Sequence, residues 1–223
     1  MLPPDAEFRA QAPSSRALRT LVVGILGGIA SGKSLAAAEL AGAEGLHLDA
    51  DRIAHLALAS PEVTARVAGA FGPGVLDASG QPDRALLAQQ IFADPEKRRQ
   101  LEGWIHPAVR ATIADELKGA RDSRVPLVVL DVPLLLENEA EHGLVAECDA
   151  LVFVDTPAED RESRARQTRG WDEREVARRE AAQLPLEQKR SRATHVLDNS
   201  GSRHALVHRA RLLRGSLLAE PPA

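Results

Sequence analysis

The sequence predicts an α/β fold in which helices cover both faces of a parallel sheet. Two observations support this class: short apolar runs recur along the chain, and longer helix-like segments separate them. Parallel strands need such long crossovers, because the chain must return to the same end of the sheet before it pairs again. The predicted strands are 21–26, 45–48, 127–130, 150–154 and 195–197. We therefore expect a five-stranded parallel sheet within three layers.

Composition limits the classes of partner. The 28 basic and 32 acidic residues leave a formal charge of -4, which provides no overall field for a nucleic-acid backbone. We expect no nucleic-acid partner, so an anionic ligand must be bound by local groups. The longest apolar run, 21–30, is shorter than the roughly 20 residues of a spanning helix, so we also expect no membrane contact. Cys148 is the single cysteine, which favours a reducing compartment and a cytoplasmic location.

The order of segments predicts one domain with two helical additions. We expect residues 1–19 to form a disordered extension, 20–218 a single domain, and 219–223 a tail. About seventy residues without a strand signal separate the second and third strands, which is too long for a simple crossover. They predict a helical insert over 56–118. A highly charged segment at 159–189, with a turn at Gly170-Trp171, predicts a mobile helical lid. The core is then 20–55, 119–158 and 190–218.

One motif carries the chemistry. Residues 27–34 read GGIASGKS and match the phosphate-binding P-loop pattern G-x-x-x-x-G-K-[ST], directly after a predicted strand and before an Ala-rich helix. In this pattern Lys33 reaches the β and γ phosphates of ATP, and the Ser34 hydroxyl ligates Mg²⁺. The predicted nucleotide-binding residues of this segment are Gly28, Ile29, Ala30, Ser31, Gly32, Lys33, Ser34 and Leu35. The alternative is a Gly-rich turn that binds nothing.

Two aspartates follow the second predicted strand. Asp49 and Asp51 lie at the carboxyl end of that strand, where open α/β sheets bind ligands. Extended residues i and i+2 point the same way, so we expect both carboxylates to face the γ-phosphate. One would accept the proton of an acceptor hydroxyl, and the other would hold a metal-bound water or position the first. The alternative is a solvated turn with a helix cap.

Lid arginines and a third aspartate complete the candidate site. Charge on a transferred phosphoryl group must be countered, and spacing favours Arg164, with Arg169 second. Other lid arginines fit a solvated helix face equally well. Asp131 ends the third predicted strand, as a metal-binding aspartate of a P-loop enzyme would, or as a plain strand terminus. These features together predict a P-loop kinase.

The ordered set of motifs resembles the dephospho-coenzyme A kinase family. Along the chain these motifs are LGGIASGKS, DADRIAHL, LEGWIHPAVR, VPLLLE, AAQLPLEQKR and HVLDNSGS. The resemblance covers about 21–213 and implies a P-loop NTPase-type fold. It also implies ATP-dependent phosphorylation of the 3′-hydroxyl of the ribose in dephospho-CoA, the last step of coenzyme A synthesis. The partners are then ATP and dephospho-CoA, in a monomer or weak homo-oligomer.

The resemblance also implies residue roles. Asp51 becomes the catalytic base, Asp49 supports it, and Asn199 lies near the adenine of ATP. The insert, with 134–137, contacts the acceptor. The usual R-D-G triplet of the lid is Thr168-Arg169-Gly170 here, so one arginine is displaced by a position, whereas Arg164 fits the family spacing.

Two other functions compete with this interpretation. A nucleoside or nucleotide kinase would share the P loop and the lid, and an acceptor screen separates it from the first interpretation. A GTPase-like switch without an acceptor is a different class. The sequence contains no N-K-x-D guanine-binding signature, and a switch of this class would not need an arginine-rich lid.

Overall fold

The computed structural model describes residues 19–92 and 94–219. Apart from Arg19, the predicted extension 1–19 lies outside these residues, as does 220–223 of the predicted tail. Ala219 belongs to the last helix, so the structured chain runs one residue into that tail. In chain order the elements are β1 Leu21–Gly27, α1 Lys33–Ala41, β2 Leu46–Asp49, α2 Ala50–Leu58, α3 Pro61–Phe71, η1 Pro73–Val75, α4 Arg84–Phe92, α5 Pro95–Asp122, β3 Leu127–Asp131, α6 Glu139–His142, η2 Leu144–Glu147, β4 Ala150–Asp155, α7 Ala158–Arg169, α8 Glu173–Glu180, α9 Leu186–Arg192, β5 His195–Asp198 and α10 Arg203–Ala219.

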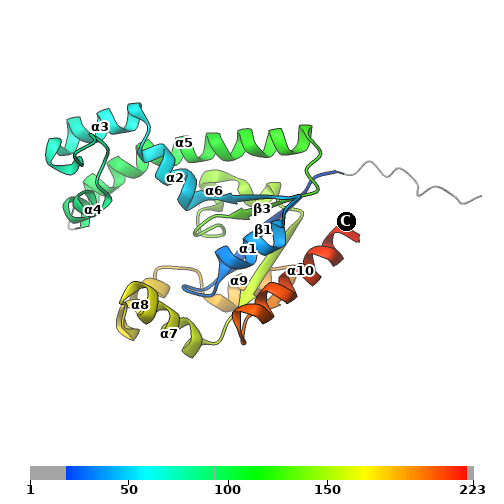
Figure 1. Cartoon of the computed structure of the whole chain (residues 1–223). Helices are drawn as coiled ribbons and strands as arrows, with labels where there is room; N and C mark the ends of the chain where they lie inside the picture. The colour runs from blue at the N-terminus through cyan, green and yellow to red at the C-terminus, as the bar shows by residue number, and fades with distance from the viewer. Residues whose placement is uncertain (1–18, 93, 220–223) are drawn as a thin grey trace, which may run out of the picture.

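The five strands form one parallel sheet in the order β2-β3-β1-β4-β5. β1 is central: Leu21 lies opposite Leu127 of β3, and Val23 lies opposite Ala150 of β4. Every residue of β1 is buried, because helices cover both faces of the sheet (Figure 1). The predicted α/β class and the parallel sheet are therefore confirmed.

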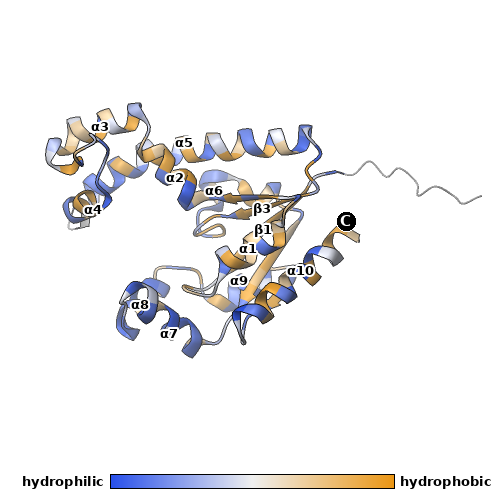
Figure 2. Cartoon of the chain, viewed as in Figure 1, coloured by the Kyte–Doolittle hydropathy of each residue, from blue (hydrophilic) through white to orange (hydrophobic). Residues whose placement is uncertain are grey.

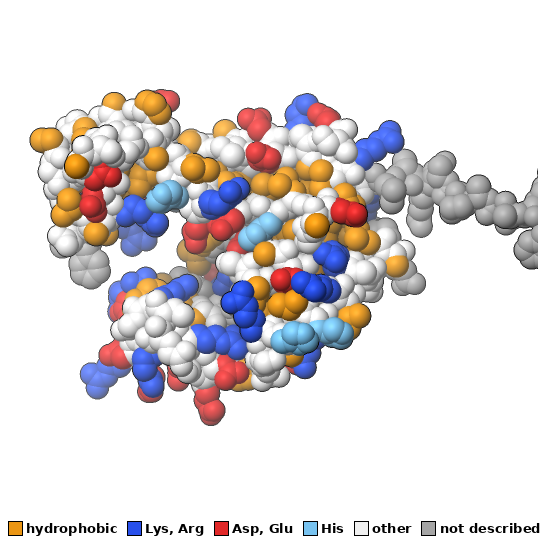
Figure 3. Space-filling model, viewed as in Figure 1, with side chains coloured by type: hydrophobic (Ala, Val, Ile, Leu, Met, Phe, Trp, Pro, Cys, Tyr) orange, Lys and Arg blue, Asp and Glu red, His pale blue; other side chains and the backbone are white. Residues whose placement is uncertain are grey.

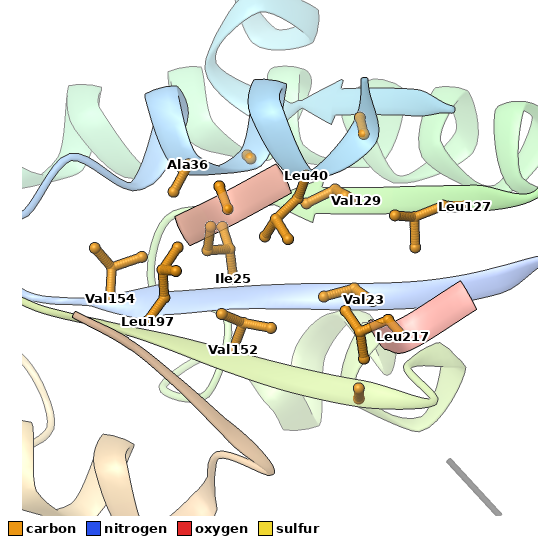
Figure 4. Close-up of a cluster of buried hydrophobic side chains, with 14 of the residues drawn as sticks. Val23, Ile25, Ala36, Leu40, Leu127, Val129, Val152, Val154, Leu197 and Leu217 are labelled. Carbon is orange, nitrogen blue, oxygen red and sulfur yellow. The ribbon is translucent and has the colours of Figure 1, made fainter. Parts of the chain in front are cut away.

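Helices α1 and α10 cover one face of the sheet. Val23 and Ile25 of β1 point to this side, while Val22 and Leu26 point to the other, as the alternation of a strand requires. Figure 4 shows the resulting layer of aliphatic side chains, with Leu217 of α10 packed beside them. This layer anchors α1 directly behind the loop that follows β1.

The other face is covered by α5, the segment after β3 and part of α9. Ile113 and Leu117 of α5 pack on Leu130 of β3 in a second cluster of buried side chains. α5 begins beside Asp94, whose carboxylate caps it by accepting hydrogen bonds from the backbone N–H groups of Glu96 at 3.0 Å and Lys97 at 3.1 Å. This long helix carries the insert away from the sheet (Figure 1).

The predicted insert has a hydrophobic core of its own. Phe71, Val67 and Val75 are buried with side chains of α2, α4 and α5, and the rings of Phe71 and Trp104 lie 5.8 Å apart. Figure 2 shows hydrophobic residues on the ribbons of α2, α3 and α4 in this part of the molecule. The insert is therefore a small helical lobe and not an extended loop.

Helices α7 and α8 form the polar lobe predicted as a lid. Gly170 ends α7 at φ 66, a left-handed conformation that glycine adopts at little cost, and α8 then folds back. Ala165 and Val176 are buried, but most of this lobe is hydrophilic (Figure 2). Of the helices that the structure describes, none combines the length and apolar character needed to cross a membrane.

Candidate active site

The P loop joins β1 to α1, as the motif predicts. Gly32 precedes the first residue of α1 at φ 87, and a Cβ built there would lie 2.8 Å from Nδ2 of Asn199. Both the conformation and the close approach require glycine at this position. The loop thus ends at the N-terminus of α1, where backbone N–H groups and the helix dipole favour a bound phosphate.

Two buried side chains hold the P loop from behind. The Ser31 carbonyl oxygen accepts hydrogen bonds from Thr156 Oγ1 at 2.9 Å and from Asn199 Nδ2 at 2.8 Å. Thr156 follows β4 and Asn199 follows β5, so the two neighbouring strand ends brace one carbonyl. Asn199 is buried, and its predicted contact with adenine stays a prediction. The structure instead shows its amide bound to the loop.

A cleft of about 560 Å³ opens in front of the loop. Its walls come from the P loop, α2, the segment after β3, the lid and α9. The lining residues are Gly27, Ile29, Ala30, Ser31, Gly32, Lys33, Ser34, Leu35, Asp51, Asp131, Pro133, Leu134, Arg164, Thr168, Arg169, Gln183 and Lys189. Of the predicted nucleotide-binding residues, Gly28 and Asn199 are outside this lining. Figure 3 shows the hollow between the lobe with α3 and α4 and the lobe with α7 and α8, with charged side chains along its edges.

Lys33 is folded back onto its own loop. Its Nζ donates to the carbonyl oxygens of Gly28 at 2.7 Å and Gly27 at 3.2 Å. Burial lowers the pKa of Lys33 to about 8, and the charges of Lys189 and Arg169 add to the effect although Asp131 opposes it. A bound phosphate would offset the charges of these neighbouring cations and raise the pKa of Lys33 again, so the loop is prepared for an anion.

Asp131 lies near the P-loop serine. It ends β3, is only 7% exposed, and is close enough to the Ser34 side chain for that hydroxyl to lower its pKa. Burial acts to raise its pKa, but His47 at 3.6 Å, Ser34 and the charge of Lys33 outweigh burial and the net shift is downward. Asp131 is therefore ionised beside Ser34, as the first of its two sequence interpretations requires.

These two oxygen donors fit Mg²⁺. Among the described residues, no group of three or more His, Cys, Asp or Glu side chains is arranged to hold a metal. Mg²⁺ in kinases typically uses one or two protein oxygens and completes its shell with water and substrate phosphates. The Ser34 hydroxyl and the Asp131 carboxylate suit that pattern, because both lie at the cleft beside Lys33.

Asp49 and Asp51 have different surroundings. The expectation that they point the same way as extended residues is wrong, because α2 begins at Ala50 and Asp51 is helical. Asp49 caps that helix, with its Oδ1 accepting from the backbone N–H of Arg52 at 3.0 Å. Asp51 instead lines the cleft, and desolvation together with the charges of Asp49 and Asp131 raises its pKa.

Asp51 also lines a second cavity. This space of about 490 Å³ lies between α2, α5 and the segment after β3, and it shares Asp51, Pro133 and Leu134 with the cleft. His106 and Arg110 of the sequence motif HPAVR line it too. The two cavities therefore meet at a carboxylate whose pKa is raised.

The lid presents two arginines to the cleft. Arg164 is half-buried, and its guanidinium has no hydrogen bond or ion pair with any residue that the structure describes. Arg169 stacks over the ring of Trp171 at 4.8 Å from its centroid and also lines the cleft. The structure brings both predicted arginines to the site. Their action on a phosphoryl group stays a prediction.

Sequence reasoning missed an ion pair in the cleft wall. Lys189 Nζ lies 2.7 Å from Glu137 Oε1 and donates to Gln183 Oε1 at 2.9 Å. Lys189 and Gln183 belong to the motif AAQLPLEQKR, and Glu137 ends VPLLLE. The only signal was their presence in these two motifs, because nothing in the local pattern shows that the segments meet.

Comparison with known proteins agrees with this geometry. The dephospho-CoA kinase family model matches residues 21–204. A dephospho-CoA kinase of Symbiobacterium thermophilum is 40% identical over 182 residues, covering 81% of this chain and 74% of the relative. One from Corynebacterium diphtheriae is 40% identical over 193 residues, covering 86% and 94%.

Solved structures agree as well. A protein of Thermus thermophilus matches with a TM-score of 0.70 and 36% identity, over 92% of this chain and all of that one. A dephospho-CoA kinase of Campylobacter jejuni matches with a TM-score of 0.64 over 89% of this chain and 97% of its own; at 23% identity it speaks for the fold alone. With the family match over most of its length, the chain belongs to the dephospho-CoA kinase family.

Proposed function

We propose that the chain transfers the γ-phosphoryl group of ATP to the 3′-hydroxyl of the ribose of dephospho-CoA, which yields coenzyme A and ADP. One observation carries this proposal: Asp51 lies where the P-loop cleft and the insert cavity meet. A kinase needs its base at that point, between the donor phosphate and the acceptor hydroxyl. Membership of the dephospho-CoA kinase family supports the choice of acceptor.

The P loop would bind the donor. Its backbone N–H groups and the N-terminus of α1 surround the β-phosphate, and Lys33 leaves its two loop carbonyls to contact the β and γ phosphates. Ser34 and Asp131 would hold Mg²⁺. When bound, this ion neutralises charge on the phosphate oxygens and orients them. Catalysis in this scheme is mostly positioning and charge neutralisation.

Asp51 would orient and deprotonate the ribose hydroxyl. Its raised pKa makes its carboxylate a better proton acceptor than that of an ordinary aspartate. Asp49 supports it from the start of α2 through its charge. Arg164, whose guanidinium has no partner among the described residues, would close over the transferred phosphoryl group, and closure of the lid would exclude water.

The proposal extends to compartment and assembly. Cys148 packs against the second buried cluster, and this burial raises the pKa of its thiol to about 12, which disfavours the reactive thiolate. That behaviour fits a cytoplasmic protein with no disulfide. We also propose that the protein is a monomer or a weak homo-oligomer.

A coupled ADP-release assay tests the function. Purified protein with Mg-ATP is given dephospho-CoA, adenosine, AMP or no acceptor, and the Lys33→Ala variant is run beside it. Turnover that requires both dephospho-CoA and Lys33 supports the proposal. Turnover with only a nucleoside or nucleotide would keep the mechanism and reject the acceptor. Arg164→Ala should lower the rate by about 10³-fold, and a change below about threefold would reject its role.

A further inference from the structure

A buried ion pair in the cleft wall has no task in the scheme above. The side chains of Lys189 and Glu137 are 5% and 13% exposed and lie 2.7 Å apart. Removing two charges from water is costly, and a buried pair is often no more stabilising than apolar side chains of the same size. The position of the pair beside the P loop suggests a functional reason for keeping it.

The lysine ammonium has one donor to spare. Its three N–H groups can make three hydrogen bonds, and two of them go to Glu137 Oε1 and Gln183 Oε1. No third partner is found among residues 19–92 and 94–219. Because Lys189 and Gln183 both line the cleft, the remaining N–H is available to a ligand there.

The lysine is also fixed before a ligand arrives. Glu137 accepts a second hydrogen bond, from the backbone N–H of Leu184 at 3.0 Å, and Leu184 packs against the buried cluster on that face of the sheet. Burial acts to raise the pKa of Glu137, but the hydrogen bond and charge of Lys189 together with backbone N–H groups outweigh burial, so the net shift of this pKa is downward. A cation held this way loses little freedom when it contacts an anion.

We propose that Lys189 binds the γ-phosphate of the nucleotide directly, as a second ammonium group beside Lys33. The inference rests on the nucleotide site proposed above. Lys189 lies close enough to Lys33 for its charge to lower the pKa of that lysine. Lys189 lines the P-loop cleft together with Lys33 and with Asp51, the proposed base. The γ-phosphate is the part of the donor that must lie between Lys33 and the acceptor.

Nucleotide binding without any acceptor tests the proposal. Calorimetric titration compares Mg-ATP, Mg-ADP and AMP on the wild-type protein and on Lys189→Met. We expect affinity for ATP to fall roughly 10- to 100-fold, the range for a lost charged hydrogen bond, and affinities for ADP and AMP to change by less than about threefold. Lys118→Met, which breaks an exposed ion pair with Asp122, is the matched control and should change none of them.

A second variant separates binding from folding. Lys189→Met leaves Glu137 buried without its cation, so the double variant Glu137→Leu, Lys189→Met restores a neutral wall. The proposal requires that this double variant recover thermal stability and still bind ATP weakly. Recovered ATP affinity, or an equal loss for all three nucleotides, would show that Lys189 is only structural. Wild-type turnover with dephospho-CoA reports on the proposed function independently of these affinities.

Discussion

The two hydrogen bonds to the Ser31 carbonyl should act as a redundant pair. Thr156 and Asn199 each donate to this oxygen, and Ser31 is 0% exposed. Thr156→Val removes one donor and should cost about 1 kcal/mol of unfolding free energy, whereas Asn199→Ala also leaves a small cavity and should cost about 1–3 kcal/mol. Each single variant still leaves the carbonyl with one partner.

The double variant should cost more than the sum. With both donors removed, a buried carbonyl is left without a side-chain partner, and the penalty for such a group is about 1–3 kcal/mol. We expect a coupling free energy of about 1–2 kcal/mol in a double-mutant cycle, measured by urea unfolding of nucleotide-free protein. Thr112→Val removes an exposed hydroxyl that bonds the Ala108 carbonyl and should change stability by less than about 0.5 kcal/mol.

The same variants should weaken ATP binding, because a released loop no longer presents its N–H groups in one conformation. Additive costs within about 0.5 kcal/mol would refute the shared-carbonyl reasoning. Unchanged stability of Asn199→Ala combined with altered preference between ATP and GTP would instead indicate that Asn199 recognises the base.

Three further predictions follow from the site. Because the pKa of Lys33 in the free protein is lowered to about 8, kcat/KM for ATP should fall about tenfold per pH unit above that value. The Lys33→Arg variant should lack this decline. A decline that persists in the variant would implicate another group. The Asp51→Asn variant should lower kcat by about 10²- to 10⁴-fold and keep its affinity for ATP. In the wild-type protein, kcat/KM should rise with pH through the raised pKa of the Asp51 carboxyl. Wild-type turnover in the variant would place the proton acceptor elsewhere. Gly32→Ala should destabilise the protein by about 1–3 kcal/mol in thermal unfolding, because φ is 87 and Asn199 lies 2.8 Å from the new methyl, whereas Gly74→Ala meets nothing within 4 Å and serves as control.

Local signals in the sequence were sufficient for the fold class and the phosphate site. The three inner strands β3, β1 and β4 are runs of apolar residues with helices on both faces, so their composition and length identify them without knowledge of their pairing partners. The P loop is likewise local, since Gly32 is required by backbone conformation and Lys33 and Ser34 follow it on one helix turn. Motif order then placed the chain in its family.

Contacts between segments distant in sequence became known only from the folded structure. Three contacts each join different strand ends or loops: the approach of Ser34 to Asp131, the hydrogen bond from Asn199 to Ser31, and the ion pair of Lys189 with Glu137. Asp49 is a helix cap because α2 starts at Ala50, directly after β2, and the backbone does not stay extended as far as Asp51. Such roles depend on which buried polar groups remain to be satisfied after the chain has folded, and that is a property of the packed molecule and not of any short window of sequence.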